Sequence, residues 1–220
     1  MSISFLLSFL VLAVGFLLPR QVKAHDPGKA AFTNKVIPDI IGCEAEIALS
    51  YFPALESASI EFRFKKDIKK SMMQAQPRGL FKGKGRYYII NISERFFVDQ
   101  QTEAISGVPS DVLIGWLVHE LGHIMDYHER SSMGLVVFGF KYLTSKKYLR
   151  DAEKAADTYA VDHGCGDYLI QCKEFILGHD DLPEAYKARI RNSYLCPETI
   201  KSMIEQREMV DIEEPVGPGI

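Results

Sequence analysis

Residues 119 to 123 read His-Glu-Leu-Gly-His and lie in a stretch with the apolar spacing of a helix. On a helix, His119 and His123 are four residues apart, so both imidazoles project from one face and can bind a single zinc ion. Glu120 lies beside them and can act as the base that activates a water molecule. This pattern predicts the core of a zinc-dependent peptidase site.

A second segment, residues 150 to 160, supplies two carboxylates one helical turn apart, Glu153 and Asp157. A catalytic zinc site needs three protein ligands and an open fourth position, and His-His-Glu is an established set. We therefore expect Glu153 to be the third ligand. Asp157 then falls where it can accept the free ring N–H of a ligand histidine and orient that ring. Small side chains on this segment would allow close packing against the first helix: Ala152, Ala155, Ala156 and Ala160.

The pair His119-Glu-Leu-Gly-His123 and Glu153-Lys-Ala-Ala-Asp157 resembles the motifs of the M48 group of gluzincin metallopeptidases, in a small, soluble, exported form. The resemblance covers roughly residues 85 to 191. It implies a compact helical zinc peptidase with a short sheet beside its cleft.

A further segment, residues 179 to 190, is similar to the His-Pro segment ending in Arg that follows the third ligand in that group, although no Pro directly follows His179. The resemblance implies that His179 stabilises the oxyanion of the tetrahedral intermediate and that Arg189 organises the site nearby. Three other side chains are chemically able to stabilise the oxyanion: His163, Tyr159 and Tyr194.

The helices and strands expected around these residues indicate an α+β fold. We expect a mainly helical zincin-like domain with a short antiparallel β-sheet beside the active-site helix. Residues 60–64 and 86–93 read as strands and as an antiparallel pair. Residues 86–93 are the candidate for an exposed edge that pairs with an extended peptide, with a plain core strand as the alternative.

The active-site helix is expected to start after Pro109 with Ser110 as its N-cap, and to end near residues 130–134. Gly122 costs a helix up to about 1 kcal/mol relative to alanine, so we expect close packing behind the metal site. The apolar run 133–140 lies between the two metal-binding helices. We expect a buried connector there, with a lid or a membrane-contacting patch as alternatives.

The N-terminus indicates export. Residues 5–18 are almost continuously apolar, and Val22-Lys-Ala24 suits signal peptidase cleavage after Ala24. We therefore expect a signal peptide over residues 1–24, a peptidase domain over 25–212, a disordered tail over 213–220, and a periplasmic or secreted protein without a stable membrane span. An uncleaved anchor is the alternative, although the apolar run is shorter than the ~20 residues of a spanning helix.

Four cysteines form an even set that could make two disulfide bonds in an oxidising compartment: Cys43, Cys165, Cys172 and Cys196. One pairing joins Cys165 to Cys172 and Cys43 to Cys196. The alternative is four free, buried thiols.

Together these features predict an exported zinc metalloendopeptidase with Zn²⁺ as cofactor and a peptide or protein as substrate. Two alternatives stay open: a zinc-stabilised binding or assembly module without turnover, and a zinc hydrolase of non-peptide amides. The formal net charge of −3 gives no reason to expect nucleic acid. The sequence leaves the oligomeric state open.

Overall fold

The β-prone runs of the N-terminal half form a four-stranded mixed sheet with the order β1-β2-β4-β3. Strands β2 and β4 run parallel, with Ile60 opposite Tyr88, whereas β3 runs antiparallel to β4, with Ala75 opposite Ile90. The strands are β1 (Lys35–Val36), β2 (Ser59–Lys65), β3 (Met73–Arg78) and β4 (Tyr87–Ser93). A separate antiparallel hairpin joins β5 (Arg95–Val98) to β6 (Gln101–Ala104).

This computed structural model of the chain describes residues 33–66, 68, 71–79, 86–98, 101–180 and 182–213. The predicted signal peptide and residues 214–220 of the predicted tail lie outside these residues. Glu213 is the last residue of a helix. Within the described part of the chain, no helix is long and apolar enough to cross a membrane.

The predicted α+β fold is confirmed, but the expectation of an antiparallel sheet is wrong. The sequence reading missed β3, because the apolar and polar alternation of residues 73–76 is short and is followed by Pro77, which argues against a strand. Proline is tolerated there because β3 is an edge strand. Since β3 returns the chain along the sheet, β4 emerges parallel to β2. The alternative given for residues 86–93, a plain core strand, therefore holds. The exposed edge is formed by β3.

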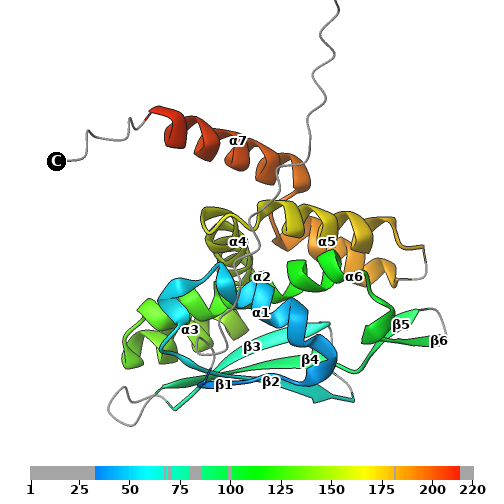
Figure 1. Cartoon of the computed structure of the whole chain (residues 1–220), viewed down its shortest axis with the longest axis horizontal. Coiled ribbons are helices and arrows are strands. Elements are labelled where there is room, and N and C mark those ends of the chain that lie inside the picture. The colour runs from blue at the N-terminus through cyan, green and yellow to red at the C-terminus, as the bar shows by residue number, and fades with distance from the viewer. Residues whose placement is uncertain are drawn as a thin grey trace, which may run out of the picture.

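Helices cover one side of the sheet, with α2 between the sheet and the remaining helices (Figure 1). Every residue of α2 from Val112 to Tyr127 is buried, because α1, α4, α5 and β3 all pack against it. The helices are η1 (Asp39–Ile41), α1 (Gly42–Ser50), η2 (Pro53–Leu55), η4 (Ile105–Gly107), α2 (Ser110–Glu129), α3 (Ser132–Thr144), α4 (Lys146–Asp162), α5 (Gly166–Gly178), α6 (Glu184–Ser193) and α7 (Pro197–Glu213).

Helix α2 has nearly the predicted bounds, but its N-cap is Pro109 and not Ser110. The hydroxyl of Ser110 instead donates a hydrogen bond to Glu44 of α1, at 2.9 Å. A Cβ atom at Gly122 would overlap the backbone carbonyl of Ala156 in α4. The expected close packing of the two motif-bearing helices is therefore confirmed.

Residues 133–140 are not a buried connector. They belong to α3, whose Leu135 and Phe138 face the protein while Met133, Val137 and Phe140 are exposed. The prediction is wrong because an uninterrupted apolar run on a helix presents apolar side chains on opposite faces, and only one face finds a partner within the fold.

The cysteines are free thiols in the structure. Cys165 is the N-cap of α5 and Cys172 lies two turns along the same helix, about 10 Å away by the helical rise. Since a disulfide needs Cα atoms within about 7 Å, the predicted pairing of these two residues is wrong. The alternative of four buried thiols holds for Cys165 and Cys172, whereas Cys43 and Cys196 are exposed.

Candidate metal centre

Helices α2 and α4 bring three candidate ligands together at the centre of the fold. Nε2 of His119 lies 3.2 Å from Oε2 of Glu153, and Nε2 of His123 lies 3.4 Å from the same oxygen. All three side chains are buried. Their ligand atoms lie within 4.8 Å of one another, so the group could hold a metal ion.

The spacing of these atoms is compatible with a metal site. A tetrahedral ion with bonds of about 2.0 Å holds its ligand atoms about 3.3 Å apart, close to the two distances observed. The donors are two imidazole nitrogens and one carboxylate oxygen, a set that suits zinc and other divalent transition metals.

Asp157 lies one helical turn beyond Glu153 and orients His119. Its Oδ1 is 2.9 Å from Nδ1 of His119, so that Nε2 faces Glu153. Its Oδ2 accepts hydrogen bonds from Nζ of Lys173 and from the backbone N–H of Leu195, each at 2.9 Å. The carboxylate is fully buried. The hydrogen bond expected between Asp157 and the ring of His119 is therefore present in the structure.

Glu153 is held by three further side chains: Tyr142, Tyr194 and Arg189. The hydroxyl of Tyr142, on α3, donates to its Oε1 at 2.6 Å, and Nη2 of Arg189, on α6, lies 3.4 Å from the same oxygen. The structure thus brings Arg189 to the site, as expected, through the candidate ligand itself. With Oε1 engaged, Oε2 remains directed at the two histidines.

His123 is held differently from His119. Its Nδ1 is buried and has no hydrogen-bond partner within the part of the chain that the structure describes. The ring instead stacks on Tyr127, with centroids 6.0 Å apart and an interplanar angle of 14°.

The charges of the site are set by burial and by close partners. Burial opposes the charged form of His119, but its hydrogen bonds to Asp157 and Glu153 outweigh that effect and raise its pKa to about 10. Burial also opposes the charge of Glu153, yet hydrogen bonds from the two histidines hold its pKa well below the ordinary value. Without a metal the site therefore retains a proton, which a bound cation would displace.

Glu120 points from α2 toward the sheet edge. Its Oε2 accepts a hydrogen bond from the backbone N–H of Ala75 in β3, at 2.5 Å. Burial raises the pKa of Glu120, and the charges of the two histidines and this N–H only partly oppose the shift. Glu120 is thus a carboxylate with increased proton affinity beside the candidate ligands.

No family model matches the chain, and it has no significant match among curated proteins or solved structures. Its likeness to the M48 group therefore rests on the motif residues themselves.

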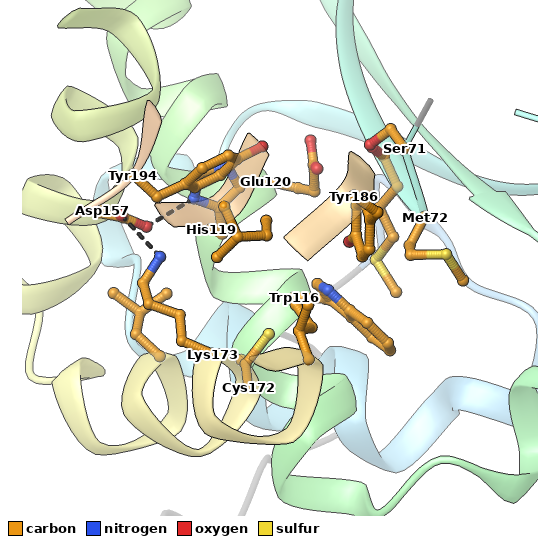
Figure 2. Close-up of a pocket in the computed structure, with 15 residues that line it drawn as sticks. Ser71, Met72, Trp116, His119, Glu120, Asp157, Cys172, Lys173, Tyr186 and Tyr194 are labelled. Carbon is orange, nitrogen blue, oxygen red and sulfur yellow. Dashed lines mark hydrogen bonds and ion pairs between the residues drawn. The ribbon is translucent and has the colours of Figure 1, made fainter. Parts of the chain in front are cut away.

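A pocket opens beside His119 and Glu120 (Figure 2). Tyr194 lies over the ring of His119 with centroids 5.1 Å apart, and Tyr186 lies on the other side of Glu120 in this view. Of the three alternatives for oxyanion stabilisation, the structure brings Tyr194 to the site. Tyr159 instead donates to the exposed Glu129 on the outer surface.

His179 and His163 lie elsewhere. His179 is the C-cap of α5 and does not line the pocket; its ring packs on Phe175, which in turn contacts Trp116 of the pocket wall. His163 stacks on Phe52 behind α4. The role assigned to His179 stays a prediction from resemblance.

Three residues of the site were missed by the sequence reading: Tyr142, Lys173 and Tyr186. Lys173 did carry a signal, because it interrupts an otherwise apolar face of α5 formed by Leu169, Cys172 and Ile176. A cation on such a face implies a buried anionic partner, here Asp157. The two tyrosines carry no comparable signal in the sequence.

Proposed function

We propose that this chain is a zinc-dependent metallopeptidase that hydrolyses peptide bonds. The observation that carries the proposal is the convergence of His119, His123 and Glu153 at the spacing of a tetrahedral site, with Glu120 beside them. We propose zinc as the metal because two imidazoles and one carboxylate form an established ligand set of catalytic zinc.

A catalytic site fits the arrangement better than a structural one. Structural zinc sites are closed by four protein ligands, most of them cysteines. The candidate group found among the described residues has three members and no cysteine, which leaves a fourth position open. Glu120 is not one of the three and has no role in a purely structural site.

A metal held by His119, His123 and Glu153 would lower the pKa of a water molecule and polarise the substrate carbonyl. Glu120 takes the proton of the attacking water and passes it to the leaving nitrogen, a transfer that the raised proton affinity of its carboxylate favours. We propose Tyr194, whose ring lies beside that of His119, as the hydrogen-bond donor to the oxyanion.

The exposed strand β3 is the proposed platform for substrate. Because the N–H of Ala75 reaches Glu120, the main chain at this residue faces away from β4 and toward the site. An extended peptide lying along this edge would pass beside the candidate ligands and could form main-chain hydrogen bonds with β3. We also propose that the enzyme acts after export, with residues 1–24 as its signal peptide.

The test compares zinc content and peptide hydrolysis in three variants. Glu120→Gln should retain zinc and lose turnover, and Glu153→Ala should lose zinc, because only the second change removes a ligand. Glu129→Gln, an exposed change on the same helix, serves as the matched control and should behave as wild type. Full zinc retention in Glu153→Ala would contradict the ligand assignment.

The same experiment addresses the alternatives. Zinc in both the wild type and Glu120→Gln, without cleavage of an unbiased peptide library by either, would favour the binding or assembly module. Cleavage of small non-peptide amides alone would keep the mechanism and change the substrate class.

A further inference from the structure

The outer face of α3 carries a stripe of exposed apolar side chains. A rotation of about 100° per residue places them within an arc of about 120° on the helix surface. The side chains, called here the α3 stripe, are Met133, Val136, Val137, Phe140 and Leu143, exposed by 71%, 51%, 43%, 69% and 84%. Contiguous exposed apolar surface of this kind marks an interaction site.

The stripe belongs to a helix that is firmly docked. On the opposite face of α3, Leu135 and Phe138 are buried. The ring of Phe138 contacts Tyr127 and Tyr148, with centroids 5.3 and 5.6 Å away, and the guanidinium of Arg130 covers it. The exposure of the stripe is therefore a property of the folded protein, and α3 presents it at the periphery of the molecule (Figure 1).

The surroundings of the stripe are basic although the chain as a whole is acidic. Residues 132–150 contain no Asp or Glu but four exposed cations: Lys141, Lys146, Lys147 and Arg150. Lys147 pairs with Asp151 at the next turn of α4, at 2.7 Å. The formal charge of the whole chain is −3, so the positive charge beside the stripe is a local feature.

We propose that the α3 stripe docks on the surface of a lipid bilayer that contains anionic lipids. Apolar side chains that enter the headgroup region beside lysines that face anionic headgroups are the features of an interfacial helix. Helix α3 lies along the surface and does not cross it, because its 13 residues extend about 20 Å, less than the hydrocarbon thickness of about 30 Å.

Charge distinguishes an anionic bilayer from the other surfaces that could cover the α3 stripe. Two copies of the chain packed stripe to stripe would bring their basic borders together, which is unfavourable. The apolar residues 5–18 of the chain itself contain no acidic side chain to face the lysines. An anionic bilayer satisfies both the apolar stripe and its cations. The inference depends on neither the metal nor catalysis.

The test is hydroxyl-radical footprinting of the full chain, with two methionines as an internal pair. Met133 lies in the stripe, whereas Met209, 57% exposed, lies on α7, away from α3 (Figure 1). Vesicles of phosphatidylcholine and phosphatidylglycerol should slow the oxidation of Met133 several-fold and leave Met209 unchanged. Vesicle binding by itself does not test the role of the α3 stripe, because residues 5–18 are also apolar and could bind vesicles.

Variants separate the apolar and electrostatic contributions. Phe140→Ser should abolish the selective protection of Met133, whereas Val210→Ser on α7 is the matched control. The double variant Lys141→Glu, Lys146→Glu should raise by at least about tenfold the concentration of anionic vesicles needed to protect Met133. Circular dichroism establishes that each variant folds.

Three outcomes overturn the proposal. Equal oxidation of Met133 with and without anionic vesicles shows that the stripe does not meet the bilayer. Protection that grows with protein concentration in the absence of vesicles assigns the stripe to a second copy. Protection of Met133 at every concentration without vesicles assigns it to another segment of the same chain. The wild-type measurement decides among these even where a variant fails to fold.

Discussion

At the scale of residues, the candidate centre is a chain of buried charges. Lys173 contacts Asp157, Asp157 contacts His119, and His119 contacts Glu153. All four are nearly or fully buried, so each depends on its neighbour for the interactions that water would otherwise supply. Removing one member therefore affects both stability and the geometry of the ligands.

We expect Asp157→Asn to destabilise the metal-free protein by about 3 kcal/mol, because Lys173 would keep a buried charge without its anionic partner. Zinc affinity should also fall by about 10-fold to 100-fold, since His119 loses the acceptor that orients it. Urea unfolding with excess chelator and a zinc competition titration measure the two effects. Asp151→Asn, at an exposed pair, is the control, and equal effects in both variants would contradict this account.

The raised pKa of Glu120 predicts the acid limit of activity. A base must be deprotonated to accept a proton, so kcat/KM should fall as pH decreases through the pKa of Glu120. Because burial raises that pKa, the fall of kcat/KM on the acid side should be centred above pH 4.5, the ordinary pKa of glutamate. A pH profile of kcat/KM checks this. Activity that stays constant down to pH 4.5 would show that the pKa of Glu120 is not raised in the active enzyme.

At the scale of elements, the centre depends on how closely α2 approaches its neighbours. Gly122 allows contact with the backbone of α4 at Ala156, and Gly115 allows contact with α5 at Tyr168 and Cys172. These two glycines lie on the helix that carries both histidines. Their lack of a Cβ atom sets the separation across which Glu153 reaches the histidines.

Gly122→Ala should therefore lower stability and zinc affinity, although alanine is the better helix former by about 1 kcal/mol. The added methyl group would overlap the carbonyl of Ala156 and push α4, with Glu153, away from α2. Overpacking of this kind costs about 1–3 kcal/mol. Thermal unfolding and zinc titration measure the change. Gly139→Ala, where an added Cβ atom has open space, is the matched control and should not destabilise.

At the scale of the whole molecule, the candidate metal centre lies within a connected apolar core. The sheet packs on one side of α2, and helices α1, α4 and α5 pack on the others. The buried apolar side chains of these elements form one connected cluster. A bound metal would add a connection between α2 and α4 to these apolar contacts.

Metal removal should consequently lower the midpoint of thermal unfolding without unfolding the protein at room temperature. A ligand that binds only the folded state stabilises it by about 4 kcal/mol at a thousand times its Kd, and a chelator removes that contribution. Circular dichroism melts with and without chelator measure the shift. Loss of the helical signal at room temperature on chelation would show that the core depends on the metal.

How much the sequence predicted differs between local and long-range features. The shared face of His119 and His123 and the bounds of α2 follow from the period of a single helix, and they were predictable. Strand β3 was missed, because Pro77 is tolerated only in an edge strand, and no local pattern shows that a segment will lie at the edge of a sheet. The disulfide between Cys165 and Cys172 was excluded only once both were seen on one helix.

The sequence by itself determined the donor types, their spacing along each helix and the presence of a base beside them. Only the tertiary structure decided that Glu153 meets both histidines, that Tyr142 and Arg189 hold Glu153, and that the apolar stripe of α3 faces outward. The physical reason is that helical periodicity acts within a few residues. Contacts between helices depend instead on side-chain packing among segments far apart in the chain.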